Sequence, residues 1–366
     1  MKMKPFLFSI ALVALLLIFN CGGSENGSGP SVVDQQQMLS NTADNIILPA
    51  YSNLSTRANR LKTWVEGFNA DPNITVLLEL RTRLQETRLA WQKCNIYEFG
   101  PASTIGLSSF LNIYPVDVNA IENNITQGNF DLEGIGAADQ RGLQAVGYLL
   151  FGTDQTDQEI VDAFAETNRQ TYLLTVVDLI RDKSEQTLEE WLESGGNYIT
   201  TFKTATGVDV GSSLSIMLNA AIQSFERKTR DGKIGIPVGL RTLGIPIPEA
   251  VEGLYSVASV ELAYENVTSF DDFLTGVGLD DSDGEGVLDY LKKVTNSDLD
   301  QTIKMQLGLV NDATENLEEP FHDEVVNNPD PANLAVAEMQ KLLVLLKTDM
   351  ASALGITITY IDNDGD

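Results

Sequence analysis

The longest uninterrupted helical pattern in the chain lies at residues 153–194, which contain neither glycine nor proline. Apolar residues recur there every three or four positions, the spacing that places side chains on one face of an α-helix. Because a helix with such a face is stabilised mainly by packing against other helices, the segment indicates one long helix, or two adjoining ones, inside a helical protein.

Further helical patterns lie on both sides of this segment. Residues 34–70 predict a helix that is interrupted near Pro49. Asp71 and Pro72 then predict a helix start, with Asp71 as the N-cap and Pro72 at the first helical position. Helical patterns also cover residues 138–151 and 210–228, and they resume near residues 249, 297 and 332. Residues 356–361 alternate β-branched side chains, which predicts a short strand or an extended tail.

These patterns predict an all-α protein. Its length allows two domains, and we expect helical-bundle-like domains at residues 34–205 and 206–366. Two irregular, loop-rich inserts, at about 100–136 and 229–250, interrupt the helical pattern. Loops of this length in a helical protein are often functional.

The N-terminus has the architecture of a secretory signal. Lys2 and Lys4 precede an apolar run over residues 5–19, and Cys21 follows. We therefore expect a lipoprotein signal peptide at 1–20, lipid attachment at Cys21 and a flexible tether at 21–33. Asn20 departs from the small residue that usually precedes such a cysteine. A secreted protein or a transmembrane anchor is the alternative, although the run is shorter than the ~20 residues of a membrane span. The expected location is the cell envelope, on the outer membrane, facing the periplasm or the cell surface.

The chain is strongly acidic, with 52 Asp and Glu against 24 Lys and Arg. Removal of the signal takes away Lys2 and Lys4, so 22 basic residues oppose 52 acidic ones, a net charge of −30. Such a field repels nucleic acid and favours cations or a basic partner, and it also maintains solubility. After Cys21 the only cysteine is Cys94, which we interpret as a small buried apolar residue.

Four segments stand out in order along the chain. They are Leu89-Ala90-Trp91 with the later Glu98-Phe99-Gly100-Pro101, the sequences RGLQAVGYLLFG (141–152) and KIGIPVGLRTLG (233–244), and the C-terminal stretch from Leu354 to Asp366. Together they resemble the imelysin-like family of bacterial envelope proteins. In that resemblance, the first corresponds to a helix and the aromatic-Gly-Pro turn that ends it, the second to the signature segment, the third to an insert found in some members, and the fourth to the family's C-terminal ending.

The resemblance implies two helical-bundle-like domains with a cleft between them. It also implies either metallopeptidase activity or a role in iron regulation or uptake, with a G-x-H-x-x-E element that holds a metal. This sequence keeps Gly142, but Gln144 stands at the histidine position and Gly147 at the glutamate position. An amide is a poor metal ligand and glycine has no side chain, so the motif is degenerate.

Other polar residues in or beside these segments are candidates for a remaining ligand cleft. They are Arg88, Tyr97, Glu98, Asp117, Arg241, Thr242 and Glu249. The alternative is that they brace loops and helix ends.

Weaker metal candidates lie elsewhere. His322, the only histidine, has acidic neighbours, and Asp281, Asp283 and Glu285 begin a calcium-loop pattern. That pattern fails at its twelfth position, which is Lys292 where an EF-hand needs glutamate. The last acidic cluster consists of Asp362, Asp364 and Asp366. Solvated acidic loops are the alternative for all of them.

The sequence therefore favours a non-catalytic binding lipoprotein in iron- or haem-related uptake. Its expected partners are the membrane, through the lipid anchor, and iron, haem or an outer-membrane uptake component, but not nucleic acid. Iron or another divalent cation is the expected cofactor. The alternatives are a metallopeptidase with a rebuilt metal site and an acidic scaffold that binds another envelope protein.

Overall fold

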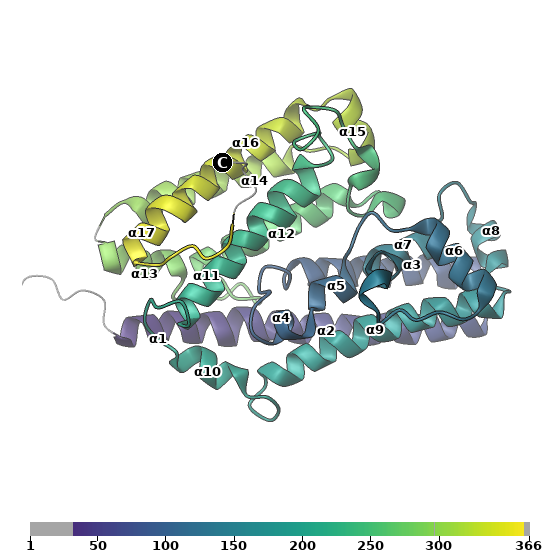
Figure 1. Cartoon of the computed structure of the whole chain (residues 1–366), viewed down its shortest axis with the longest axis horizontal. Helices are drawn as coiled ribbons and strands as arrows, with labels where there is room; N and C mark the ends of the chain where they lie inside the picture. Colours follow the sequence, from purple (N-terminus) through teal and green to yellow (C-terminus); the bar gives the residue numbers. More distant parts are fainter. Residues whose placement is uncertain (1–31, 296, 362–366) are drawn as a thin grey trace, which may run out of the picture.

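The computed structural model describes residues 32–295 and 297–361 (Figure 1). Within these ranges the protein is all-α, as predicted. The described residues contain no β-strand, and a single isolated antiparallel bridge joins Val277 to Asp283. The predicted signal peptide, Cys21 and the acidic residues Asp362, Asp364 and Asp366 lie outside the described residues. None of the described helices has both the length and the apolar character needed to cross a bilayer.

The helical elements of the first part of the chain are α1 (Val32–Asn41), η1 (Thr42–Ile47), α2 (Leu48–Ala70), α3 (Ile74–Gln92), α4 (Pro101–Ile105), α5 (Leu107–Leu111), α6 (Val118–Gln127), η2 (Ile135–Gln140), α7 (Gly142–Phe151), α8 (Asp157–Ala163), α9 (Thr167–Trp191) and α10 (Tyr198–Thr204). The second part contains α11 (Ser213–Ser224), η3 (Phe225–Gly235), η4 (Pro248–Ala250), η5 (Leu254–Ser256), α12 (Ser259–Thr275), α13 (Val287–Thr295), α14 (Leu299–Glu315), α15 (Phe321–Asn327), α16 (Asp330–Val344), η6 (Leu345–Met350) and α17 (Ala351–Leu354).

The first helix runs without a break from residue 32 to residue 70, and the predicted interruption is a change of helix type. Proline has no N–H, so Pro49 cannot bond the carbonyl of Asn45 four residues earlier. The π-helical segment η1 directly precedes this turn. The Asn45 carbonyl instead accepts the backbone N–H of Leu279, with an N···O distance of 3.0 Å. A distant loop thus satisfies the group that Pro49 leaves unbonded.

The predicted start of the next helix is wrong by two residues. Asn73, not Asp71, is the N-cap of α3, and its side-chain oxygen accepts the N–H of Val76 at 3.0 Å. The Asn73 side-chain amide donates back to the Asp71 carbonyl at 2.9 Å. Pro72 therefore lies in the link between α2 and α3, and Asn73 supplies the acceptor that the first turn needs.

The segment at 153–194 forms two helices, α8 and α9. A capping box starts α8, in which Thr156 and Glu159 bond each other's backbone N–H groups. The long helix α9 packs along α2, and the two lie side by side in the lower part of Figure 1. Helix α3 lies against α2 on one side and α12 on the other, so it connects the two parts of the molecule.

In the second part of the chain, α14, α16, α12 and η3 pack together (upper part of Figure 1). The buried apolar residues of both parts form one continuous cluster that extends from Met38 to Ile356. The division predicted at 205–206 falls in the link between α10 and α11, and it stays a prediction.

Both predicted inserts are more helical than expected. The first contains α4, α5 and α6. The second was expected to begin at residue 229, but α11 continues directly into the π-helical η3 and ends only at Gly235. Glycine at 232 and 235 did not stop the helix, because η3 is buried on most of its length and packs against α12 and α16.

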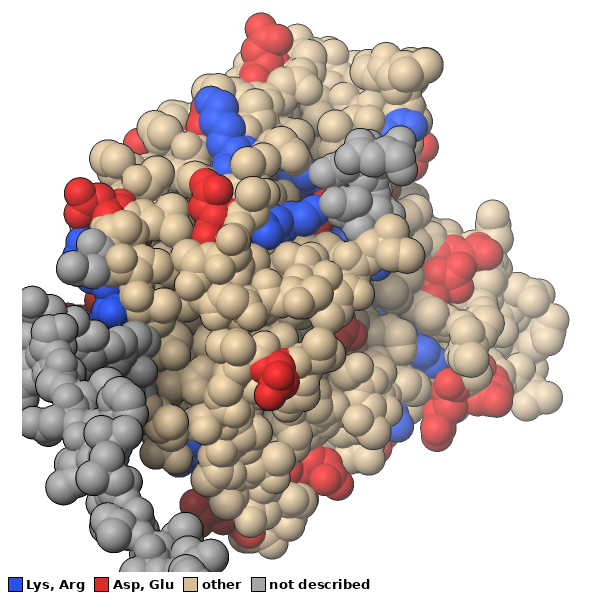
Figure 2. All heavy atoms as spheres, turned by 60° about the vertical axis from the view of Figure 1, so that its left-hand side comes forward, with Lys and Arg blue, Asp and Glu red and all other residues tan. Residues whose placement is uncertain are grey.

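The C-terminal segment at 356–361 is extended and pairs with no strand. The side chain of Asn219 in α11 holds it, donating to the Thr357 carbonyl at 3.0 Å and accepting from the Thr359 N–H at 2.7 Å. Figure 2 shows acidic side chains at separate points of one face of the molecule, where they do not form a single patch.

Candidate functional site

The three motif positions lie on α7, and all are buried. Gly142 begins the helix with a φ of +81°, and a Cβ at this position would lie 2.5 Å from the carbonyl oxygen of Leu111. Gln144 is 2% exposed. Its Nε2 donates to Oδ1 of Asn112 at 2.9 Å, and its Oε1 accepts the N–H of Gly253 at 3.0 Å. Gln144 thus connects three separate segments of the chain.

The space beside Gly147 is filled by the guanidinium of Arg88 from α3. A Cβ at position 147 would lie 2.1 Å from Nη2 of Arg88. The guanidinium donates to Oγ of Ser256 at 2.5 Å and to the carbonyl of Leu143 at 3.2 Å. Both acceptors are neutral, so they do not balance the positive charge of Arg88. This charge lies where the G-x-H-x-x-E element would have its glutamate.

Arg88 stays protonated although it is 1% exposed. Burial lowers its pKa to about 10, and the negative charge of Glu252 acts in the opposite direction. A cation close to this guanidinium would be repelled more strongly than in water, because the surroundings have a low dielectric constant. The Nε atom of Arg88 has no hydrogen-bond partner among the residues that the structure describes.

A buried ion pair lies beside Arg88. Lys233 from η3 donates through Nζ to Oε2 of Glu252, and also to Oε1 of Gln92 at 2.8 Å. The other carboxylate oxygen of Glu252 accepts from Gln92 and from Asn112, each at 2.9 Å. Burial lowers the pKa of Lys233, and its pairing with Glu252 raises it. Both carboxylate oxygens of Glu252 therefore accept at least one hydrogen bond.

Side-chain amides extend this arrangement into α12. Asn95 donates to Oε1 of Gln92 at 2.9 Å, and Asn266 donates to Oδ1 of Asn95 at 2.8 Å. Thr229 closes the chain by donating to Oδ1 of Asn266. We call the whole set the buried polar network; its members are Arg88, Gln92, Asn95, Asn112, Gln144, Thr229, Lys233, Glu252 and Asn266.

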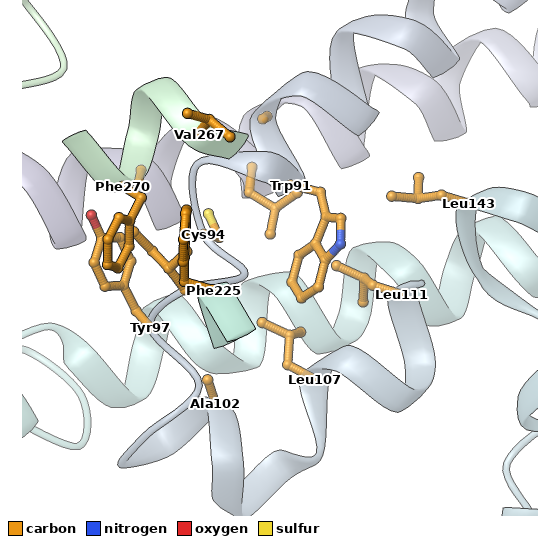
Figure 3. Packing of buried hydrophobic residues seen from close by; sticks show 14 of the residues in the cluster. Trp91, Cys94, Tyr97, Ala102, Leu107, Leu111, Leu143, Phe225, Val267 and Phe270 are labelled. Carbon is orange, nitrogen blue, oxygen red and sulfur yellow. The ribbon is translucent and has the colours of Figure 1, made fainter. Parts of the chain in front are cut away.

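A cavity of about 310 Å³ lies beside the network. Asn95, Asn112 and Lys233 belong to both. The cavity takes its lining from both sides of the predicted boundary at 205–206. Its apolar lining residues are Trp91, Ile113, Tyr114, Pro115, Ile236 and Ala250. Figure 3 shows the Trp91 ring among Leu107, Leu111 and Leu143.

Sequence reasoning missed Lys233 and Glu252. Lys233 precedes an apolar stretch, Ile234 to Val238, and Glu252 stands among apolar and glycine residues. A lone charge in such a stretch is a usable signal, because a buried charge is retained only when it is paired.

Seven residues were proposed for a cleft. Of these, only Arg88 belongs to the buried polar network. Tyr97 is buried, with its ring edge-on to Phe273. Glu98 forms an ion pair with Lys228.

The remaining cleft candidates lie at helix ends and loops. Asp117 is the N-cap of α6 and accepts the N–H of Ala120 at 2.9 Å. Arg241 forms an ion pair with Asp231 at 2.5 Å, Thr242 bonds carbonyls of its own loop, and Glu249 is exposed in η4.

The described residues contain no group of three His, Cys, Asp or Glu side chains that is able to hold a metal ion. The Nε2 atom of His322 lies 3.6 Å from Oδ1 of Asp323. Glu285 forms an ion pair with Lys293, and Asp281 has a positive φ of 62°. Asp283 belongs to the isolated bridge with Val277. These candidates are therefore not brought together in the described part.

Comparison with known proteins gives the family. The sequence profile described as Imelysin matches residues 47–348. The chain belongs to the imelysin family. Its fold matches a crystal structure from Parabacteroides distasonis described as an iron-regulated protein A precursor. That match has a TM-score of 0.77 at 19% identity and covers 90% of this chain and 97% of the other.

Two further relatives agree with this family. An imelysin-like protein from Psychrobacter arcticum has a TM-score of 0.66 at 16% identity, covering 92% of this chain and 100% of its own. The protein named Iron-regulated protein A from Synechococcus elongatus is 21% identical over 119 residues. That match spans 32% of this chain and 32% of the relative's length. The predicted family resemblance is thus confirmed.

Proposed function

We propose that this imelysin-family protein is a lipid-anchored binding component of the cell envelope that acts in iron- or haem-related uptake without catalysing a reaction. The family and the names of its relatives support the iron-related part. The observation that carries the non-catalytic part is the position of Arg88, whose guanidinium occupies the space next to Gly147. A metallopeptidase centre at these positions would have to form beside a buried positive charge.

Ligand titration tests the binding role. The chain from residue 21 onward is titrated by calorimetry with Fe²⁺, Fe³⁺, Zn²⁺, Ca²⁺ and haem. Binding of iron or haem at micromolar concentration is the expected result. If none of these ligands binds in that range, the uptake role is wrong.

Cleavage of an unfolded protein substrate tests the absence of catalysis. We expect no cleavage of casein with or without a chelator. Cleavage that a chelator abolishes would instead support a metallopeptidase with a rebuilt metal site.

The lipid anchor is tested by metabolic labelling with a fatty acid. Cys21→Ser is expected to abolish the label and to leave the protein in the soluble fraction. Cys94→Ala is the matched control, since it removes the other cysteine, and it should retain the label. Label on the Cys21→Ser variant would contradict anchoring at this residue.

The charge of the chain favours one alternative, an acidic scaffold for another envelope protein. With 52 acidic and 24 basic residues, such a contact would be driven by charge. Charge-driven contacts weaken as salt screens them. A partner recovered from membranes at low salt and lost at high salt, together with no iron or haem binding, would favour the scaffold.

A further inference from the structure

The cavity beside the buried polar network is lined by basic side chains, although the chain as a whole is strongly acidic. The lining contains three basic residues and no Asp or Glu: Arg227, Lys228 and Lys233. Even with the acidic partners of these residues included, positive charge remains. Lys228 pairs with Glu98 and Lys233 with Glu252, whereas Arg227 forms no ion pair within residues 32–361. Its guanidinium donates to the carbonyl of Ile361.

The π-helical geometry of η3 brings these cations together. Arg227 and Gly232 are five residues apart, as are Lys228 and Lys233. Five residues is the hydrogen-bonding step of a π-helix, so such pairs lie closer to one face than they would in an α-helix. In an α-helix, residues five apart point in clearly different directions. π-Helical segments occur frequently at functional sites.

The rest of the lining is suited to the body of a small molecule. Apolar and aromatic residues make up about half of it, among them Trp91, Tyr114 and Pro115. A concave, mostly apolar surface with a few fixed polar groups is the usual form of a ligand site, and ~300 Å³ is the lower end of the usual size. The site therefore suits a small ligand.

Two donor groups of the lining lack a full set of acceptors among the described residues. The ammonium group of Lys233 has three N–H donors, and the described residues provide two acceptors for it, on Glu252 and Gln92. The indole Nε1 of Trp91, another lining residue, is buried and has no hydrogen-bond partner in the described part of the chain. A carboxylate accepts several such donors at once.

We propose that this cavity binds a small organic anion, a carboxylate on a short aromatic or aliphatic body. Lys228, Lys233 and Arg227 hold the carboxylate, and the apolar lining residues hold the body. This site goes beyond the proposed iron-related role and does not depend on it, because the anion itself contains no metal.

Benzoate is the probe, with benzamide as its uncharged isostere. The chain from residue 21 onward is titrated with each compound, and binding is followed by calorimetry and by the tryptophan emission of the protein. Benzoate is expected to bind at least roughly tenfold more tightly than benzamide, a ratio that corresponds to about 1.4 kcal/mol. Its effect on the emission should disappear in Trp91→Phe, because Trp91 lines the cavity and Trp64 and Trp191 do not.

Lys228→Gln tests the charge, and Lys93→Gln is its matched control. The Lys228 side chain is 32% exposed and pairs with Glu98, and the Lys93 side chain is 31% exposed and pairs with Glu265. Only Lys228 lines the cavity. We expect Lys228→Gln to weaken benzoate binding by roughly tenfold and Lys93→Gln to change it less than about twofold. Arg227→Gln, at an exposed position, is the second variant if Lys228→Gln does not fold.

Three results would overturn the proposal. They are no benzoate binding up to high millimolar concentration, equal binding of benzoate and benzamide, and equal effects of the Lys228 and Lys93 substitutions. Failure here leaves iron and haem titrations unaffected, so the two proposals fail separately. A protein that binds haem but not benzoate would reject only the anion site.

Discussion

The missing side chain of Gly147 leaves the space on α7 that the guanidinium of Arg88 occupies. We expect Gly147→Ala to destabilise the protein. Alanine favours a helix by about 1 kcal/mol over glycine, but the new Cβ would lie 2.1 Å from Nη2 of a buried, hydrogen-bonded side chain. Overpacking of this kind costs about 1–3 kcal/mol. The net loss, about 1 kcal/mol, is measured by urea unfolding.

Two variants separate this contact from helix propensity. Gly308 lies in α14 with no atom within 4 Å of an added Cβ, so Gly308→Ala should be neutral or stabilising. In a chain that carries Arg88→Met, the Gly147→Ala change should lose most of its cost. If Gly147→Ala and Gly308→Ala have the same effect, the contact with Arg88 is not what requires glycine.

The half-buried carboxyl group of Asp272 on α12 makes the stability of the folded protein depend on pH. Burial raises the pKa of Asp272 to about 6; Lys93 opposes this, and the acidic Asp271 and Glu265 add to it. The folded state then binds the proton more tightly than the unfolded state, whose pKa is about 4. The contribution of Asp272 to the free energy of unfolding is therefore fully present below pH 4, and it is lost as the pH rises through 6.

Asp272→Asn removes this dependence. We expect the variant to exceed the parent by about 1 kcal/mol in the free energy of unfolding at pH 7.5 and to match it near pH 4. Asp154→Asn, at an exposed position, is the control and should show no such crossover. A variant that is less stable than the parent at pH 7.5 would contradict the assignment.

The sequence predicted what is missing at the motif but not what replaces it. Gln144 and Gly147 are visible in the sequence, and their inability to ligate a metal follows from their chemistry. The position of Arg88 depends on how α3 packs on α7, a contact between residues 59 positions apart. No local pattern encodes that contact, so the buried polar network required the structure.

At the scale of elements, helices were predicted well and their ends less well. The apolar spacing that identified α9 and α16 reflects the faces that they bury. Ends depend on single acceptors, as with Asn73, and on tertiary packing, as in η3, where buried contacts extend the helix past Gly232. The π-helical geometry has no known pattern in the sequence, although it aligns the lysines of the cavity.

One prediction concerns how the C-terminal segment is held. Asn219→Ala removes the side-chain bonds to Thr357 and Thr359 and is expected to destabilise the protein by about 1–3 kcal/mol, the cost of unpaired buried groups. Hydrogen exchange should become faster at the Thr359 amide. Asn333→Ala, on the exposed face of α16, is the control. Unchanged exchange at Thr359 would show that other contacts hold the segment.

At the scale of the whole molecule, the all-α class followed directly from the sequence because most of the chain shows helical spacing. Charge is the other property of the whole chain. With 22 basic and 52 acidic residues after the signal, the folded chain repels itself. Raising NaCl from about 10 to 200 mM should therefore raise the melting temperature by a few degrees, since the screening length falls below about 10 Å.

Calorimetry at several salt concentrations measures this effect. KCl at equal ionic strength should give the same rise as NaCl, because screening does not depend on the identity of the ion. A melting temperature that falls with salt would mean that ion pairs such as Arg57–Glu86 outweigh the general repulsion.

Cys94 lies where α3, η3 and α12 meet, close to Trp91, Tyr97 and Phe225 (Figure 3). It is 1% exposed, and burial raises the pKa of its thiol well above the usual value. The thiolate, which is the reactive form, is therefore absent until this region opens. In a Cys21→Ser chain Cys94 is the only thiol. Its rate of alkylation in native buffer would then give the free energy with which the two parts of the molecule transiently separate.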